Sequence, residues 1–385
     1  MGLGHGKLHL AGFPDVPGVE IVYVCDVDQR RMEEGVAIVK KKQSAPVQGV
    51  GDFRRILDDP SIDAITIAAP NFWHTPATLM ACAAGKHVYV EKPGSHNAHE
   101  AELIVAAARK HGRVVQMGNH RRSVPYIIEA VERLRAGEIG TLRYARCASS
   151  NHRGTIGTGH EVPVPAWLNY DLWQGPIPHR PYRDNLVHYN WHWMWHWGGG
   201  ELANTGPHFL DLARWGLGVD APVRVTCSGR RYHYVDDQET PDQAAVTFDF
   251  GDKGMSYDWS SANLRVSEAI PIVRFYGDKG SLSLEKDGYK IHDLDGHELV
   301  KVTGQKGTDV AHYANFIEGI RGNARLHSEI AEGQKSSLLC HLGNIAQRTG
   351  GAIDFDPKTR RIVGNPEAEK KYWSREYRAG WEPKV

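Results

Sequence analysis

The sequence has no long apolar run and no net charge. No stretch of about 18 apolar residues is present, which is the length that an α-helix needs to cross a bilayer. The 46 Lys and Arg residues are balanced by 46 Asp and Glu residues. Nucleic acids and anionic lipid surfaces are held by clustered positive charge. We therefore expect neither a nucleic-acid partner nor a membrane partner.

Cysteine is scarce, and a secretory signal is missing. The five cysteines are odd in number and are never spaced as Cys-x-x-Cys, which argues against a disulfide framework and against a zinc site. The segment from Met1 to Gly6 has neither the basic nor the apolar part of a secretory signal. We expect a cytoplasmic protein, with export as the alternative if N-terminal residues are missing from this sequence.

Apolar strand-like segments alternate with helix-like segments between residues 19 and 117. Asn97 with Glu100 three positions later predicts a helix start, as does Thr75 followed by Pro76. The predicted strands are 19–25, 64–69, 88–90 and 114–117, and the predicted helices are 28–41, 75–85 and 97–112. This alternation is typical of a parallel, doubly wound sheet. The sequence therefore predicts an α/β protein with a dinucleotide-binding Rossmann domain over residues 1–118.

Glycines and a carboxylate stand where such a sheet binds its ligand. Gly2, Gly4 and Gly6 precede the first helix and let backbone amides approach a pyrophosphate. Asp26 follows the next strand, about twenty residues later, and is placed to accept hydrogen bonds from the ribose hydroxyls of NAD. A carboxylate there repels a 2′-phosphate, so NAD is favoured. The nearby pair Arg30-Arg31 leaves NADP open as an alternative.

Only Met1 precedes the glycine loop, so the first strand of a Rossmann domain is missing from this sequence. Either upstream residues are absent from the sequence, or the domain lacks a central strand and binds its cofactor weakly. We favour the first interpretation.

Glu91-Lys92-Pro93 follows the predicted strand at 88–90. Proline restricts Lys92 to extended backbone and so sets the direction of its side chain. A lysine ammonium in a cleft can hydrogen-bond a substrate hydroxyl and stabilise the oxyanion that forms as a hydride leaves. An isolated Lys-Pro pair is more often a surface turn, so the surrounding motifs decide between the two interpretations.

These motifs resemble the glucose–fructose oxidoreductase, inositol dehydrogenase and MocA family. The resemblance rests on Pro70-Asn71-Phe72-Trp73-His74, on Glu91-Lys92-Pro93, and on a glycine-rich turn at 198–200 that precedes His208. It implies an NAD(P) domain followed by a substrate-binding and oligomerisation domain over residues 119–385. It further implies a homodimer or homotetramer formed through the C-terminal sheet.

The resemblance also implies roles for single residues. Lys92 and His208 are expected to be catalytic and to face the nicotinamide, with His208 taking the substrate proton. The family's usual acidic residue falls on Asn204, which carries no charge and is expected to act by hydrogen bonding. The positions that match cofactor-lining residues are Gly2, Gly4, Gly6, Asp26, Pro70, Asn71, His74, Glu91, Lys92, Asn119, Trp173 and Arg180.

The second half of the chain predicts an α+β domain with an open, mostly antiparallel sheet. Short strand-like segments are joined by Gly-Asp-Lys-Gly turns. The predicted strands are 142–148, 223–229, 244–250, 255–260, 270–276 and 281–284, and the predicted helices are 207–217, 309–321 and 328–347. The aromatic tail from residue 365 to residue 385 is expected to pack on a surface.

Residues 151–200 hold six of the 11 tryptophans and six of the 21 histidines. The tryptophans from Trp191 to Trp197 occupy every second position, which is the period of a strand. Indole rings pack on the C–H faces of sugars, and imidazoles bond the hydroxyls. The substrate-binding residues predicted on this basis are Tyr182, His188, Trp191 and His192. A buried aromatic core or a subunit interface explains the tryptophans equally well.

Three histidines of this segment, His188, His192 and His196, are also candidate metal ligands. Strand geometry over residues 191–197 would place two of them, His192 and His196, on one face, but no nearby carboxylate pattern completes a site. We therefore expect hydrogen-bonded pocket histidines and no metal.

Taken together, the sequence predicts an NAD-dependent oxidoreductase that transfers a hydride between nicotinamide and a hydroxyl-bearing carbon of a sugar, cyclitol or glycoside. Two alternatives stay open. The resembled family includes NAD-dependent glycoside hydrolases, which oxidise the sugar transiently and eliminate the aglycone. The missing first strand is also compatible with a non-catalytic family member whose cofactor binding is impaired.

Overall fold

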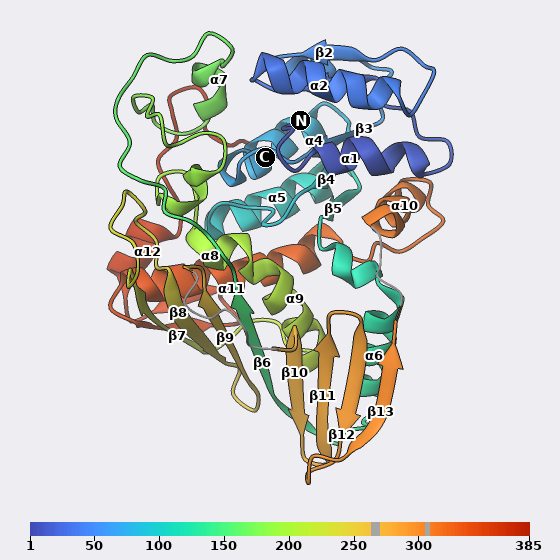
Figure 1. Ribbon diagram of the computed structural model, residues 1–385, viewed down its shortest axis with the longest axis vertical. Coiled ribbons are helices and arrows are strands. Elements are labelled where there is room, and N and C mark those ends of the chain that lie inside the picture. The colour runs from blue at the N-terminus through green and yellow to red at the C-terminus, as the bar shows by residue number, and fades with distance from the viewer. Residues whose placement is uncertain (263–269, 305–308) are drawn as a thin grey trace.

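The N-terminal half alternates strands and helices as predicted, and its strand pairs are all parallel (Figure 1). The computed structural model describes residues 1–262, 270–304 and 309–385. The strands are β1 (Tyr23–Cys25), β2 (Gln48–Val50), β3 (Ala64–Ile67), β4 (His87–Val90) and β5 (Val115–Met117). The helices are α1 (Lys7–Gly12), the short 3₁₀ helix η1 (Phe13–Asp15), α2 (Gln29–Lys40), α3 (Arg54–Leu57), α4 (Asn71–Ala83) and α5 (Ala98–Lys110).

These strands form two separate sheets, β1–β2 and β3–β4–β5. Among the described residues no strand lies between β1 and β3, in agreement with the sequence prediction. Met1 stands at one end of the gap: its amino group donates to the Thr66 carbonyl at 2.9 Å, and its carbonyl accepts from the Ala68 N–H at 2.8 Å. The Gly2 N–H donates to the Cys25 carbonyl at 3.0 Å. The glycine loop is therefore anchored to both sheets.

Helix α5 begins where the sequence predicts. The Asn97 side chain caps it by accepting the Glu100 N–H at 2.9 Å. The Glu100 carboxylate accepts the N–H of His96 at 3.0 Å, one residue before the cap. Both bonds satisfy backbone donors that a helix start leaves without an internal partner.

Helix α4 begins at Asn71, four residues before the predicted start at Thr75, so Pro76 lies inside the helix. Proline has no N–H to bond the carbonyl four residues earlier, which here belongs to Phe72. That carbonyl instead accepts from Arg375 Nη2 at 2.8 Å. The C-terminal tail thus supplies the hydrogen bond that the proline removes, which no local pattern could predict.

A ten-stranded sheet forms the centre of the C-terminal half, in the order β13-β12-β11-β10-β6-β9-β8-β7-β14-β15. Every neighbouring pair is antiparallel except β6 and β9. The predicted strands correspond to β6 (Leu142–Ser150), β7 (Arg224–Arg230), β8 (Gln243–Asp249), β9 (Gly254–Ser260), β10 (Val273–Gly277) and β11 (Gly280–Glu285). The sequence did not predict β12 (Gly288–His292), β13 (Glu298–Thr303), β14 (Ala352–Asp356) or β15 (Arg361–Val363).

Helices pack on the face of this sheet that lies toward the N-terminal half (Figure 1). They are α6 (Pro125–Arg135), α9 (Gly206–Leu217) and α11 (Ile330–Arg348). The remaining elements are η2 (His120–Ser123), α7 (Tyr170–Gln174), η3 (Asn190–Trp193), α8 (Gly200–Asn204), α10 (Asp309–Ile320) and α12 (Pro366–Tyr372). No helix among the described residues is both long and apolar enough to span a membrane.

Two late segments of the chain pack on the N-terminal half. On α10, the Tyr313 ring stacks on Phe13 with centroids 4.3 Å apart. In the tail, the Trp381 ring meets Trp73 edge-on at 5.2 Å. The predicted packing of the aromatic tail is thereby confirmed.

The segment from Trp191 to Trp197 is not a strand, so that prediction is wrong. It contains η3 followed by turns, and Trp191, Trp193 and Trp197 are each at most 5% exposed. These rings belong to a core shared with Phe72 and Trp173. The 3₁₀ helix and the turns after it bring these indoles into one core, and this burial outweighs the local strand-like period. Most of the tryptophan excess therefore builds the core.

Candidate active site

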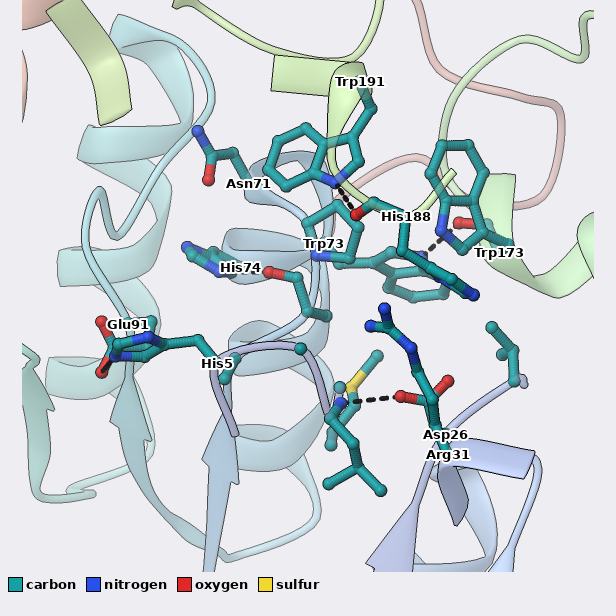
Figure 2. Close-up of a pocket in the computed structure, with 18 of the residues that line it drawn as sticks. His5, Asp26, Arg31, Asn71, Trp73, His74, Glu91, Trp173, His188 and Trp191 are labelled. Carbon is teal, nitrogen blue, oxygen red and sulfur yellow. Dashed lines mark hydrogen bonds and ion pairs between the residues drawn. The ribbon is translucent and has the colours of Figure 1, made fainter. Parts of the chain in front are cut away.

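A cavity of about 500 Å³ opens at the carboxyl ends of β1, β3 and β4 (Figure 2). This is the edge at which parallel α/β sheets bind their ligands. The predicted residues that line it are Gly2, Gly4, Asp26, Pro70, Asn71, His74, Glu91, Lys92, Trp173, His188, Trp191, His192 and Asn204.

The glycine loop brings bare backbone to this cavity. Gly2 has φ of +81°, and a Cβ there would lie 2.5 Å from the Ala69 nitrogen. A Cβ at Gly6 would overlap the Gly2 carbonyl oxygen. At Gly4 a Cβ would meet only the Arg31 side chain, at 3.3 Å, so its backbone faces the cavity. The loop therefore fits the pyrophosphate of a dinucleotide, which needs closely approaching amides.

Asp26 holds the loop in place. Its Oδ2 accepts the Leu3 N–H at 2.7 Å, and its Oδ1 accepts the Asp28 N–H at 2.8 Å. Arg31 lies beside it in the cavity (Figure 2). Arg30 instead pairs with Asp28 at 3.0 Å and covers an indole ring. Arg30 and Arg31 are the residues for which NADP was kept as an alternative cofactor. Of the two, only Arg31 lines the cofactor cavity.

Lys92 lies at the inner end of the cavity, and its Nζ donates to the Asn204 backbone carbonyl at 2.9 Å. The contact uses the main chain of Asn204, so the side chain of that residue does not hold the ammonium. Burial lowers the pKa of Lys92, and the charge of Glu91 only partly offsets this. The Lys92–Pro93 peptide bond is cis.

Glu91 sits among imidazoles. The Nε2 atoms of His9 and His5 lie 3.1 and 3.7 Å from its Oε1. Burial opposes ionisation of Glu91, but the hydrogen bond to His9 and the charges of His9, His5 and Lys92 outweigh it, and they hold the pKa of Glu91 below its usual range. The carboxylate is therefore ionised, and its hydrogen bond to His9 ties α1 to the residue after β4.

His208, on the first turn of α9, is not among the residues that line the cavity, but it lies near His120. Its ring centroid is 5.4 Å from that of His120, whose Nδ1 is 3.9 Å from Asp309 Oδ1. Burial, reinforced by the charges of Lys92 and Arg121, holds the pKa of His208 well below its ordinary value. The imidazole is therefore neutral at neutral pH and able to accept a proton.

Two family matches cover most of the chain. Residues 1–119 match the family described as "Oxidoreductase family, NAD-binding Rossmann fold", and residues 155–383 match its "C-terminal alpha/beta domain". The chain belongs to the Gfo/Idh/MocA oxidoreductase family. The N-terminal half of this oxidoreductase is thus an NAD-binding Rossmann domain, as the glycine loop indicates.

Similarity to individual proteins is partial in sequence and extensive in fold. A glycosyl hydrolase family 109 protein of Shewanella putrefaciens is 34% identical over 110 residues, which are 27% of this chain and 24% of that protein. The chain therefore matches about a quarter of that curated relative's length.

Two solved structures share the fold across both halves. One is an oxidoreductase from Agrobacterium radiobacter in complex with NAD⁺, L-tartaric acid and magnesium, with a TM-score of 0.70, 16% identity, and 92% and 96% of the two chains covered. The other is an aldose–aldose oxidoreductase from Caulobacter crescentus complexed with glycerol, with a TM-score of 0.69, 19% identity, and 92% and 98% covered. At these identities the similarity shows the fold.

This oxidoreductase also has site residues that the sequence did not single out. Glu201 is fully buried on α8. Its carboxylate accepts a hydrogen bond from Arg153 Nε at 2.9 Å and another from the Thr205 hydroxyl. Arg153 Nη1 in turn donates to the Tyr189 hydroxyl at 2.7 Å, and Tyr189 lines the cavity. The carboxylate directly after the glycine-rich turn was a visible signal, but its arginine lies 48 residues away in the sequence.

Five predicted site residues do not line the cofactor cavity, and His208 is one of them. Arg180 lines a separate cavity and covers the Trp197 ring. Tyr182 is 7% exposed and packs on Tyr170, so it is a core residue and the substrate role predicted for it is withdrawn. Asn119 is buried with both side-chain polar atoms unpartnered, and Gly6 supports the loop from behind.

The three histidines considered as metal ligands have separate partners. His188 bonds Asp28 at 2.8 Å, His192 bonds the Tyr189 carbonyl at 2.6 Å, and His196 bonds the Pro178 carbonyl at 2.9 Å. Their rings therefore do not converge. Within the described residues, ligand atoms of a three-residue group lie within 4.8 Å of one another at Asp293, Asp295 and His297, a mostly exposed cluster in the turn after β12.

Proposed function

We propose that this protein is an NAD-dependent oxidoreductase that acts on a hydroxyl-bearing carbon of a sugar, cyclitol or glycoside. The observation that carries the proposal is the Lys92 ammonium in the cofactor cavity, close enough to a neutral His208 for its charge to lower the pKa of that imidazole. Lys92 can donate a hydrogen bond to a substrate oxygen, and His208 can accept the proton of the substrate hydroxyl.

The side chains divide the work as follows. Lys92, kept in place by the Asn204 carbonyl, stabilises negative charge on the substrate oxygen. His208 accepts the hydroxyl proton. Bound NAD supplies the hydride acceptor at the adjacent carbon. Because Lys92 and Arg121 disfavour an imidazolium at His208, the proton is passed on, and His120 with Asp309 is the next pair of titratable groups.

The polar groups at this end of the cavity support a polyhydroxylated substrate. The Tyr189 hydroxyl, oriented by Arg153, and the His192 ring both line it. Burial lowers the pKa of His192 to about 3, so its ring is neutral at neutral pH. Neutral donors and acceptors of this kind match hydroxyl groups better than they match a charged substrate.

The test is a panel of sugars, cyclitols and glycosides, with NADH absorbance and product both followed. Lys92→Met and His208→Asn are expected to lower kcat by at least about 100-fold with the best substrate, the usual scale for removing a general acid–base group. NAD affinity should change little. Lys110→Met, at an exposed lysine on α5, is the matched control. Full turnover in both site variants would contradict the proposal, and failure of NAD to bind would leave the non-catalytic alternative.

A second candidate is an NAD-dependent glycoside hydrolase, favoured by the name of the Shewanella putrefaciens relative. Such an enzyme would oxidise a sugar hydroxyl, eliminate the aglycone, add water and reduce the product again. Release of p-nitrophenol from aryl glycosides without accumulation of NADH would support this function over net oxidation.

A further inference from the structure

A second cavity of about 640 Å³ shares no lining residue with the cofactor cavity. Segments that are distant in sequence enclose it. They are residues 96–97 before α5, residues 177–180, residues 195–199 after η3, Glu239, the C-terminal part of α11 and residues 371–376. Figure 1 shows α8, α11 and α12 side by side at this edge of the molecule. The proposed reaction does not use this cavity, although His96 and Asn97 of the NAD-binding domain line it.

Several buried polar atoms at this cavity lack a partner. Arg375 bonds Glu100 through Nε at 2.8 Å and the Phe72 carbonyl through Nη2 at 2.8 Å, but its Nη1 is buried with no acceptor. Asn97, only 6% exposed, uses its Oδ1 as a helix cap and leaves Nδ2 without an acceptor. Both ring nitrogens of His96 are buried and unpartnered. Buried polar groups are almost always hydrogen-bonded, so these atoms indicate a bound species.

The charge at this cavity is predominantly positive. Arg180, Arg348 and Lys371 line it, and none of them forms a salt bridge with a described residue. Arg348 lies over the rings of Trp195 and Tyr372, 4.6 and 4.2 Å from their centroids. Arg375 is a fourth cationic side chain and pairs with Glu100. Against these four, the carboxylates are that of Glu100 and those of the two lining Glu residues at positions 239 and 376, so one positive charge remains in excess.

We propose that this second cavity binds a small molecule with a carboxylate or phosphate group. The oxyanion would accept hydrogen bonds from Arg375 Nη1, Asn97 Nδ2 and His96. Donors outnumber acceptors among the unpartnered atoms, and hydrogen bonds from a guanidinium to an oxyanion are among the strongest available. A neutral ligand would leave the excess positive charge without compensation.

The cavity also adjoins the segments that position Lys92. Gly198 and Gly199 line it and lead directly into α8, whose last residue supplies the carbonyl that holds the Lys92 ammonium. His96 follows Lys92 by four residues on the other wall. A ligand here would therefore contact both chain segments that set the position of the lysine.

Calorimetric titration of NAD-saturated protein with inorganic phosphate and, separately, with citrate tests this site. Saturation with NAD fills the glycine-loop anion site, so binding that remains belongs elsewhere. Asn97→Asp keeps a good helix cap but replaces the free donor by an oxygen, and it should weaken binding at least about tenfold. Arg348→Gln should do the same. Arg378→Gln, on the same tail but paired with Asp171 outside the cavity, is the control and should leave the affinity unchanged.

Each outcome has a defined meaning. Binding of phosphate alone assigns a phosphorylated ligand, and binding of citrate alone assigns a carboxylate. Absence of binding by both probes overturns the proposal. The proposal is also overturned if Arg378→Gln and Asn97→Asp weaken binding equally, because the loss of affinity would then reflect the general charge of the surface and not this cavity. None of these readouts depends on turnover, so the result is independent of the proposed oxidoreductase function.

Discussion

Asp26 shows how a single side chain combines an architectural and a selective role. Its two oxygens accept the N–H groups of Leu3 and Asp28, so it ties the glycine loop to the start of α2. The same carboxylate lines the cofactor cavity next to Arg31. Its negative charge disfavours a 2′-phosphate, whereas the guanidinium beside it would attract one.

Asp26→Asn is therefore expected to have two effects. The amide keeps only one acceptor oxygen, so the loop loosens and the Kd of NADH rises about tenfold, the cost of one hydrogen bond to a charged group. Loss of the charge should shift the ratio of NADPH to NADH affinity toward NADPH by about tenfold or more. Fluorescence titration with both nucleotides measures this. Glu34→Gln, at an exposed ion pair on α2, is the control, and an unchanged ratio would contradict the expectation.

At the scale of the elements, the N-terminal sheet is interrupted by a gap between β1 and β3. A cavity of about 600 Å³ extends along it, lined by side chains of both strands and of α10. Burial lowers the pKa of the Met1 amino group, which lies at its end. Met1 already makes the parallel hydrogen-bond pattern with β3. The gap has the shape and the open backbone edges of a strand position.

Adding five β-branched residues before Met1 should therefore stabilise the protein. The added strand would bury apolar side chains between β1 and β3 and move the charged amino group out of the sheet. We expect the thermal midpoint to rise by at least about 3 °C, corresponding to roughly 2.5 kcal/mol for a protein of this size, and NAD to bind more tightly. A Gly-Ser extension of equal length is the control, and equal midpoints for the two extensions would refute this expectation.

At the scale of the whole molecule, buried histidines couple stability to pH. Burial lowers the pKa of His312 to about 4 and that of His341 to about 3. In the unfolded chain both would titrate near 6.5. Between these values the unfolded state binds protons that the native state does not, so the free energy of unfolding falls as pH falls below about 6.5.

Urea unfolding between pH 7.5 and pH 4.5 should show this loss of stability, with each histidine contributing up to about 1.4 kcal/mol per pH unit. His341→Gln removes one of the groups and should make the dependence shallower. His99→Gln replaces an exposed histidine on α5 and should leave the slope unchanged. Identical slopes for the wild type and His341→Gln would show that His341 does not contribute.

Local sequence patterns determined the elements of this protein. Apolar segments with helix caps between them predict the Rossmann alternation, and antiparallel strands joined by glycine turns predict the C-terminal sheet, because both depend on neighbouring residues. The glycine loop, Asp26 and the Lys92-Pro93 pair were also visible, since each chemistry-bearing group lies within a short motif. The four strands from β12 to β15 escaped prediction, although the alternation of apolar and polar residues in β12 and β14 was a visible signal.

Tertiary structure decided which distant groups meet. Pro76 is tolerated inside α4 because Arg375 satisfies the carbonyl that it leaves free, and Glu201 is tolerated in the interior because Arg153 pairs with it. The segment after Trp191 abandons its strand-like period because burying its indoles in the shared core is more favourable than local extension. Such long-range burial and charge pairing leave no local pattern in the chain. The sequence by itself therefore determined the motifs and the fold class, and only packing decided which residues share a cavity.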